Sequence, residues 1–207
     1  MGNLDKIIKV MDHPDGGEMF YEYVLRWATE LPEDLIFVDI GSYKGGTTMA
    51  IMQAVHDSGK RRWVWSIDPY GTKPFRLGTG IQAEAQYDEE IYKSAMSNLS
   101  TAAQELNVAQ YHWRMTSEDF MKIIEQIDFY DQGKVIKPRF GFVSIDGDHD
   151  GEVTEKELQW FLLRMPDGGF ILDDVPYIKQ RGTPLVKQAV EKGLGDNFRC
   201  YIDIKQF

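Results

Sequence analysis

The stretch FVSIDGDHD, residues 142–150, decides the fold, and GFILDD, residues 169–174, repeats its pattern. In both stretches an apolar run with the length of a strand stops at carboxylates. A strand that is buried on both faces reads as a nearly continuous apolar run, which is typical of a parallel sheet covered by helices. Ligands bind beyond the carboxyl ends of such strands. Because gathered carboxylates repel one another unless a cation lies between them, the two stretches predict a divalent-metal site on an α/β sheet.

Outward from these stretches, apolar runs alternate with helical patterns along most of the chain. Besides the two strands that end in acids, the apolar runs predict strands at 35–40, 63–68, 110–115 and 198–205. The helical patterns fall at about 47–56, 88–106, 120–127, 152–165 and 183–193. This alternation predicts a Rossmann-like α/β fold, a doubly wound and mostly parallel sheet with helices on both faces.

The residues before the first strand form a separate helical segment. It is expected in two pieces, broken at 13–17, and the second piece carries Phe20, Tyr23, Val24 and Trp27 at helical spacing. Aromatic residues at this spacing favour a helix packed on the sheet, and a cap over the ligand cleft is the alternative. We therefore divide the chain into an N-terminal helical cap at 1–34 and a Rossmann-like domain at 35–207, within one globular unit.

Composition restricts the kind of partner. The 207 residues carry a net charge of −10, which argues against nonspecific binding to nucleic acid or to an anionic membrane. Cys200 is the only cysteine, so no intramolecular disulfide can form. The first residues are too charged for a signal peptide, and no apolar run approaches the roughly 20 residues of a membrane span. A cytoplasmic protein is expected.

A glycine-rich turn, GSYKGG at 41–46, follows the first strand. With Thr47 as the expected N-cap of the next helix, it would present backbone N–H groups and a positive helix end to a ligand. The spacing matches neither the dinucleotide fingerprint nor the phosphate-binding P-loop. Asp39, two residues before Gly41, would repel a phosphate and favour a cationic ligand.

Two further strand ends carry polar residues. Asp68 ends the second strand, where it is suited either to accept hydrogen bonds from a ribose or to form the turn 68–71, and neither reading is favoured. The third strand ends at 116–119, TSED, which is typical of a helix N-cap. Between these strands, residues 70–90 form a long irregular connection of the kind that often serves as a lid or substrate loop.

Residues 146–157 fit the pattern of an EF-hand calcium loop, with acids at positions 1, 3, 5 and 12 and a glycine at position 6. An EF-hand needs a helix that runs directly into position 1. Residues 138–145, PRFGFVSI, predict a strand there instead, and no second loop is present to pair with the first. The context therefore argues against a calcium hand.

Taken together, the strand ends resemble those of the class I S-adenosylmethionine-dependent methyltransferases. The likeness covers roughly residues 35–175 and rests on VDIGSYKGGT at 38–47, Asp68, TSED at 116–119, IDGDH at 145–149 and PDGG with LDD at 166–174. The last two motifs are similar to a narrower group, which comprises the catechol-type and macrolide-sugar O-methyltransferases and the cephalosporin-hydroxylase-like proteins.

This resemblance implies roles for individual residues. It implies S-adenosylmethionine held by a set of polar and glycine residues, namely Asp39, Gly41, Ser42, Gly45, Thr47, Asp68, Ser117, Glu118 and Asp146. It also implies Mg²⁺, or another divalent cation, on Asp146, Asp173 and Asp174, and His149 as the general base. The alternative for His149 is a turn residue that the nearby acids satisfy. Domains of this class usually finish with an antiparallel pair of strands, and the sequence predicts only one of them, so we expect a sheet short by a strand.

The implied function is a Mg²⁺-assisted O-methyl transfer to a hydroxyl of a small molecule with neighbouring oxygens, such as a sugar, a catechol or a related natural product. The rival is a non-catalytic domain that binds calcium through residues 146–157. A hydroxylase is disfavoured because His13, His56 and His112 stand in unrelated places and suggest no iron triad. The sequence does not choose among these substrates, and it leaves open whether the chain forms a homo-oligomer.

Overall fold

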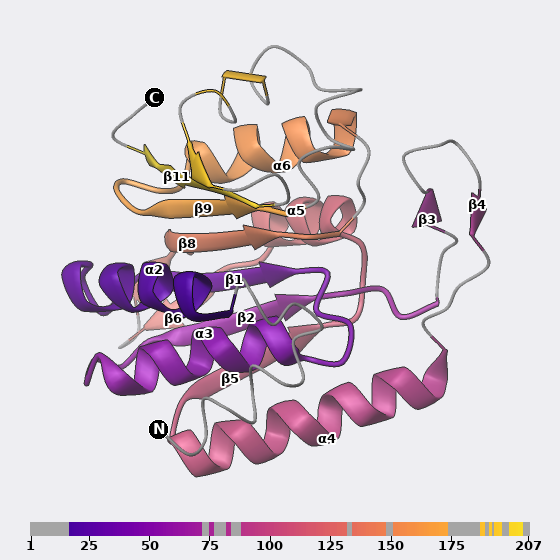
Figure 1. Cartoon of the computed structure of the whole chain (residues 1–207), viewed down its shortest axis with the longest axis horizontal. Coiled ribbons are helices and arrows are strands. Elements are labelled where there is room, and N and C mark those ends of the chain that lie inside the picture. The colour runs from indigo at the N-terminus through magenta and orange to yellow at the C-terminus, as the bar shows by residue number, and fades with distance from the viewer. Residues whose placement is uncertain are drawn as a thin grey trace.

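The computed structural model describes residues 17–71, 75–76, 82–83, 88–131, 134–147, 151–173, 187–188, 191, 193–195 and 199–204. Within them, seven strands form one sheet (Figure 1). In spatial order these are β10 (Leu194–Gly195), β11 (Cys200–Asp203), β9 (Gly169–Leu172), β8 (Phe140–Ile145), β1 (Ile36–Ile40), β2 (Trp63–Ile67) and β5 (Ala109–Trp113). β11 runs antiparallel to both of its neighbours, β10 and β9, and the other pairs in this sheet are parallel, so the expected Rossmann-like sheet is confirmed.

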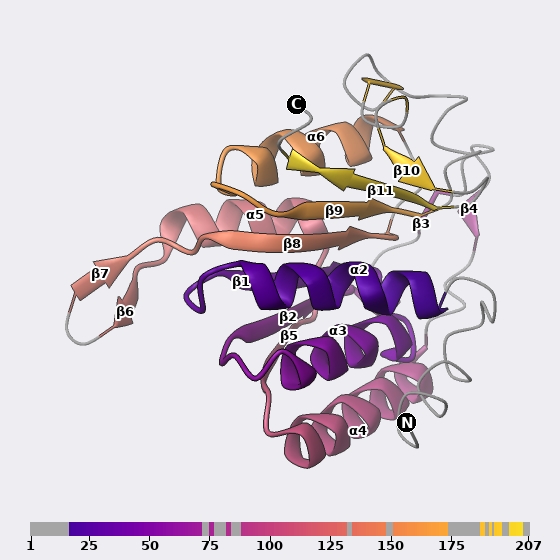
Figure 2. The same ribbon diagram turned by 60° about the vertical axis from the view of Figure 1, so that its left-hand side comes forward.

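Helices cover both faces of this sheet (Figures 1 and 2). One face carries α2 (Gly17–Glu30), α3 (Gly46–Asp57) and α4 (Glu89–Leu106), and the other carries α5 (Ser117–Gln126) and α6 (Gly151–Leu162). No helix in the described part of the chain is long and apolar enough to cross a membrane.

Two hairpins lie outside the sheet. β3 (Phe75–Arg76) pairs with β4 (Gln82–Ala83) within the long connection after β2. β6 (Phe129–Asp131) and β7 (Lys134–Ile136) form a second hairpin, which projects beyond the sheet (Figure 2) and which no sequence pattern predicted.

Two expectations about the ends of elements were wrong. Helix α3 has no side-chain cap from Thr47, because it begins at Gly46 and its N-cap is Gly45 in the left-handed conformation. The sheet is not short by a strand, because the two-residue β10 pairs antiparallel with β11 and completes the final pair. The first helical piece, before residue 17, lies outside the described residues, as does most of the helix expected at 183–193.

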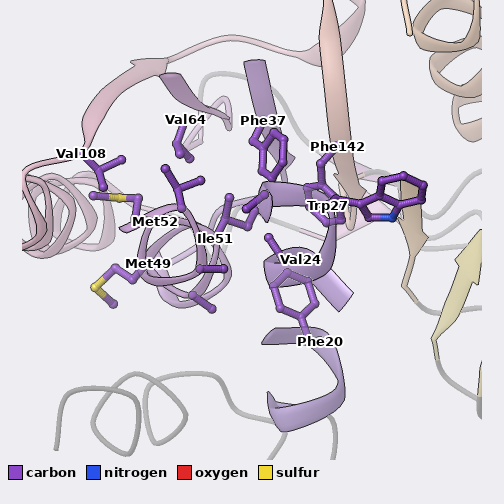
Figure 3. Packing of buried hydrophobic residues seen from close by; sticks show 14 of the residues in the cluster. Phe20, Val24, Trp27, Phe37, Met49, Ile51, Met52, Val64, Val108 and Phe142 are labelled. Carbon is purple, nitrogen blue, oxygen red and sulfur yellow. The ribbon is translucent and has the colours of Figure 1, made fainter. Parts of the chain in front are cut away.

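The alternation of side chains along each strand builds two cores, one on each face. On the first face, Phe142 of β8 packs against Phe37 of β1, with ring centroids 5.5 Å apart, and against Phe20 of α2 at 6.2 Å (Figure 3). Val143 and Ile145 point to the opposite face, into the core beneath α5 and α6. Both faces of β8 are buried, which is why its sequence is a continuous apolar run. Helix α2 packs into the first core through Phe20 and two further buried residues, Val24 and Trp27.

We expect Phe142→Ala to lower the free energy of unfolding by about 3–5 kcal/mol, because it leaves a cavity between α2 and the centre of the sheet. Leu163→Ala is the matched control, since Leu163 is 84% exposed, and it should change stability by less than about 0.5 kcal/mol. Urea unfolding followed by circular dichroism measures both. Equal losses would show that Phe142 does not hold this core together.

Candidate active site

The carboxyl ends of the parallel strands are joined by one further row of backbone hydrogen bonds. The amide of Gly41 donates to the carbonyl of Ile67 at 2.9 Å, and the amide of Asp146 donates to that of Ile40 at 2.9 Å. Equivalent bonds of 3.1 Å and 3.0 Å join Asp68 to β5 and Asp173 to β8. Each accepting carbonyl belongs to the last residue of the neighbouring strand. The structure therefore brings Asp68, Gly41, Asp146 and Asp173 into one line, which we call the strand-end row.

Gly41 makes the closest contact in this row. Its φ is +87°, and a Cβ atom added there would lie 1.9 Å from the carbonyl oxygen of Asp146. Only glycine lets the loop after β1 lie directly against the end of β8. Gly45, at the other end of the loop, also has a positive φ, of +89°, and a Cβ atom there would lie 3.0 Å from Leu99 on α4. The two glycines thus allow the loop to pack closely against the end of β8 and against α4.

Asp39 is the fourth residue of β1, contacts Thr48 of α3 and is fully buried. Its Oδ2 atom accepts a hydrogen bond of 2.5 Å from Thr48, while its Oδ1 atom has no hydrogen-bond partner within the described residues. Burial raises the pKa of Asp39 to about 7, and the charges of Asp68 and Asp173 act in the same direction. The hydrogen bond from Thr48 and the charge of Arg199 oppose this rise. A buried acid with an unpaired oxygen is suited to a cationic ligand.

Asp68 holds the glycine-rich loop. Its Oδ2 atom accepts a hydrogen bond of 3.0 Å from the amide of Tyr43, and its Oδ1 atom accepts one of 2.9 Å from the amide of Tyr70. Burial raises the pKa of Asp68, and the two backbone hydrogen bonds oppose that effect. The turn that the sequence suggested at 68–71 is therefore present, and the carboxylate is tied to both sides of it.

Asp173 is paired with an arginine that sequence reasoning missed. The Nε atom of Arg199 donates to Oδ2 of Asp173 at 2.7 Å, and both side chains are less than 10% exposed. Burial alone would lower the pKa of the Arg199 guanidinium, but the negative charges of Asp173 and Asp146 keep it above its ordinary value. Arg199 stands directly before β11, and no local pattern in the sequence marks it. Its positive charge lies among the acids of the strand-end row.

Some of the residues expected to bind the metal or to act as the base lie outside the residues that the structure describes. His149 and Asp174, with Asp148 and Asp150, fall among the residues that the structure does not describe. Across the described residues, no group of three carboxylate, histidine or cysteine side chains is arranged to hold a metal ion. Of the metal ligands that the resemblance implies, only Asp146 and Asp173 can therefore be located.

The polar residues after β5 open helix α5. Thr116 caps this helix, its hydroxyl accepting a hydrogen bond of 3.2 Å from the amide of Asp119, as its sequence predicts. Ser117 is buried in the first turn, whereas Glu118 is half-buried and pairs with Lys156 of α6 at 3.1 Å. On α3, the residue that contacts Asp39 is Thr48 rather than Thr47, which is half-buried.

The calcium-hand pattern is not an EF-hand. Strand β8, and no helix, leads into Asp146. Helix α6 already begins at Gly151, the sixth position of the pattern, and Glu157, the twelfth, is fully buried within that helix. A calcium loop needs an irregular backbone over most of these positions.

Comparison with known proteins agrees with this geometry. A family described as a methyltransferase domain matches residues 38–175, which span β1 to the residues just after β9. The solved structure of CalS11, a calicheamicin methyltransferase, superposes with a TM-score of 0.64 at 10% identity, covering 97% of this chain and 90% of that one. Cofactor-bound Rv0187 from MTB superposes with a TM-score of 0.54 at 12% identity, covering 97% and 88%. At these identities the solved structures show the fold. The comparison with curated proteins gave no match.

The resemblance to the class I methyltransferases seen in the sequence is confirmed. Because the family match covers more than half of the chain, the chain belongs to this methyltransferase-domain family.

We expect Gly41→Ala to destabilise the fold far more than Gly59→Ala. Both glycines have positive φ, +87° and +69°, so each substitution strains the backbone by about 1–2 kcal/mol. A Cβ atom at Gly59 meets nothing within 4 Å, whereas at Gly41 it collides with the Asp146 carbonyl. The Gly41 variant should therefore lose at least about 3 kcal/mol in all, measured by urea unfolding. Similar losses in the two variants would contradict this close contact.

We expect Asp39→Asn to change how stability depends on pH. Folded Asp39 releases its proton at about pH 7, and an unfolded aspartate does so at about 3.9. Between these values the folded state binds more protons, so Asp39 makes the free energy of unfolding fall as pH rises, by at most about 4 kcal/mol. Asparagine does not titrate. The free energy of unfolding of the variant, measured relative to that of the wild type, should therefore increase between about pH 5 and about pH 8. Urea unfolding at both values tests this, and parallel pH profiles would refute it.

Proposed function

We propose that this methyltransferase transfers the methyl group of S-adenosylmethionine to a hydroxyl oxygen of a small molecule that carries a neighbouring oxygen, with a divalent cation, Mg²⁺ by preference, as a second cofactor. One observation carries this proposal: the strand-end row sets Asp146 directly beside Gly41 of the glycine-rich loop, with Asp173 next to Asp146. The ends of β1 and β2 would hold the methyl donor, and the ends of β8 and β9 would hold the acceptor. The two reactants would then meet at the middle of the sheet.

The electrostatics of the site suit a cationic methyl donor. S-adenosylmethionine carries a positive sulfonium and an ammonium group, and the buried carboxyl of Asp39 has an oxygen that no described group satisfies. The loop from Gly41 to Gly45, with the hydroxyl of Ser42, would line the methionine part of the cofactor. Asp68 would accept hydrogen bonds from the ribose hydroxyls with its remaining lone pairs, since each of its oxygens accepts one hydrogen bond from a backbone amide. Ser117 and Glu118, at the positive end of α5, would border the adenine.

The acids beyond β8 and β9 offer the type of donor atom that a hard divalent ion binds. Asp146 and Asp173 offer carboxylate oxygens, which Mg²⁺ prefers, and Asp174 would be the third ligand. When bound, such an ion orients neighbouring substrate oxygens and lowers the pKa of a hydroxyl. Arg199 already donates to one oxygen of Asp173, and this bond orients the carboxylate.

The reaction needs one proton acceptor and one aligned oxygen. The S–CH₃ bond of the donor breaks as the O–CH₃ bond forms, and the sulfonium becomes a neutral thioether. The hydroxyl proton must leave, and His149, three residues after Asp146, is the residue we assign to accept it. Related folds support a small-molecule acceptor, because CalS11 is described as a TDP-rhamnose 3′-O-methyltransferase, with a TM-score of 0.55 at 9% identity.

We expect the wild-type protein to bind S-adenosylhomocysteine in the micromolar range by calorimetry. It should methylate a member of a panel of catechols and nucleotide sugars, and EDTA should abolish this turnover until Mg²⁺ is restored. Absence of binding would remove the cofactor assignment. Full turnover in EDTA would support the methyl transfer and exclude a role for the divalent cation.

The same assay separates the proton acceptor from the cofactor site. His149→Ala should lower kcat by roughly 10²–10⁴-fold and leave the affinity for S-adenosylhomocysteine unchanged. His56→Ala is the control, because His56 bonds the carbonyl of Leu106 at the far ends of α3 and α4. An unchanged kcat for the His149 variant would exclude it as the base.

A further inference from the structure

The hydroxyl of Tyr70 contacts the glycine-rich loop from within the protein. It donates a hydrogen bond of 2.5 Å to the carbonyl of Tyr43 and lies 3.1 Å from the hydroxyl of Ser42. The amide of the same tyrosine donates to Asp68. Tyr70 is 2% exposed, so it supports the loop from below and does not face the space above it. The loop after β1 and the turn after β2 are thus joined through one side chain.

Both tyrosines in this contact have an unusual backbone conformation. Tyr43 has a φ of 45° and Tyr70 a φ of 42°, in the left-handed region that side chains other than glycine and asparagine rarely adopt. Among the described residues, the one other such case is Asn107, an asparagine at the end of α4. Strained residues persist only where the surroundings hold them, and they gather at functional sites. Here the surroundings are the hydrogen bonds that Asp68 and Tyr70 make.

The ring of Tyr70 is fixed by two neighbours. Its centroid lies 5.2 Å from that of Tyr92 on α4 and 5.3 Å from that of His112 on β5. His112 bonds the buried hydroxyl of Ser66 through Nδ1 at 2.8 Å, and burial lowers the pKa of its ring to about 4. The His112 ring is thus neutral and held in place by its hydrogen bond, so it restrains the Tyr70 ring that packs against it. Because the phenol ring cannot shift sideways, its hydroxyl reaches the loop at one position.

We propose that Tyr70 is a positioning residue for the cofactor: it holds the loop from Gly41 to Gly45 in the shape that receives the methionine end of S-adenosylmethionine. This inference rests on the proposed function, since it takes that loop as the cofactor site. Tyr70 acts through Tyr43 and Ser42 and does not touch the cofactor. A loop held in its binding shape before the ligand arrives loses less conformational entropy on binding, so the contact raises affinity.

Tyr70→Phe tests the role, because it removes the hydroxyl and keeps the ring. Calorimetry with S-adenosylhomocysteine should show about tenfold weaker binding, which corresponds to the loss of one such preorganising contact. The KM for S-adenosylmethionine should rise by a similar factor, with kcat at saturation within about threefold of wild type. Tyr111→Phe is the matched control, since Tyr111 is 51% exposed on the edge strand β5, and its affinity should stay within about twofold of wild type.

A second substitution separates positioning from simple loss of packing. Asparagine tolerates the left-handed conformation better than tyrosine, so Tyr43→Asn should reduce the need for the Tyr70 hydroxyl. In the Tyr43→Asn background, Tyr70→Phe should weaken binding by no more than about threefold. A general packing defect would give the same loss in both backgrounds.

The outcomes are distinct. If the wild type binds S-adenosylhomocysteine and Tyr70→Phe binds it equally well, the positioning role is overturned and the proposed function stands. If Tyr70→Phe still weakens binding tenfold in the Tyr43→Asn background, the role is also overturned. The effect of the Tyr70 hydroxyl then comes from packing in the core and not from the conformation of the loop. If the wild type does not bind the probe at all, the proposed function fails and this inference fails with it.

Discussion

The structure depends on one close contact, that between the loop after β1 and the end of β8. The amide of Asp146 donates to the last carbonyl of β1, and Gly41 approaches the carbonyl of Asp146 so closely that no Cβ atom fits between them. This contact continues the hydrogen bonding of the parallel strands past their ends. It therefore brings the glycine-rich loop and Asp146 side by side at the end of the sheet.

Charge is the second constraint on that surface. Asp39, Asp68, Asp146 and Asp173 lie at the carboxyl ends of β1, β2, β8 and β9, and like charges at this spacing disfavour one another's ionisation. The chain balances them with hydrogen bonds from backbone amides, from Thr48 and from the buried Arg199. The site thus keeps its acids and suits a cationic ligand, such as the sulfonium or the divalent metal ion of the proposed function.

Much of this arrangement could be predicted from the sequence. Strands β8 and β9 were evident because both of their faces are buried, which leaves a continuous apolar run that ends at the acids. The cap of α5 was evident because Thr116 carries its signal locally. Residues whose roles come from partners distant in the sequence could not be predicted. Arg199, just before β11, pairs with Asp173, just after the neighbouring strand β9, and Tyr70 supports Tyr43 from a different loop. The hairpin β6–β7 was missed because its strands are too short for a period-two pattern to emerge.

The sequence by itself determined the class of fold, the order of its elements and the residue types at each strand end, because hydrophobic periodicity and turn chemistry are local properties of the chain. Only the tertiary structure decided which of those residues meet. The strand order sets β1 between β2 and β8, and this places Gly41 between Asp68 and Asp146, far from both in sequence. It also decided that the N-cap of α3 is Gly45 rather than Thr47, at a position where a Cβ atom would lie 3.0 Å from Leu99 of α4. Contacts between distant segments depend on the packing of the whole sheet, and no local pattern encodes them.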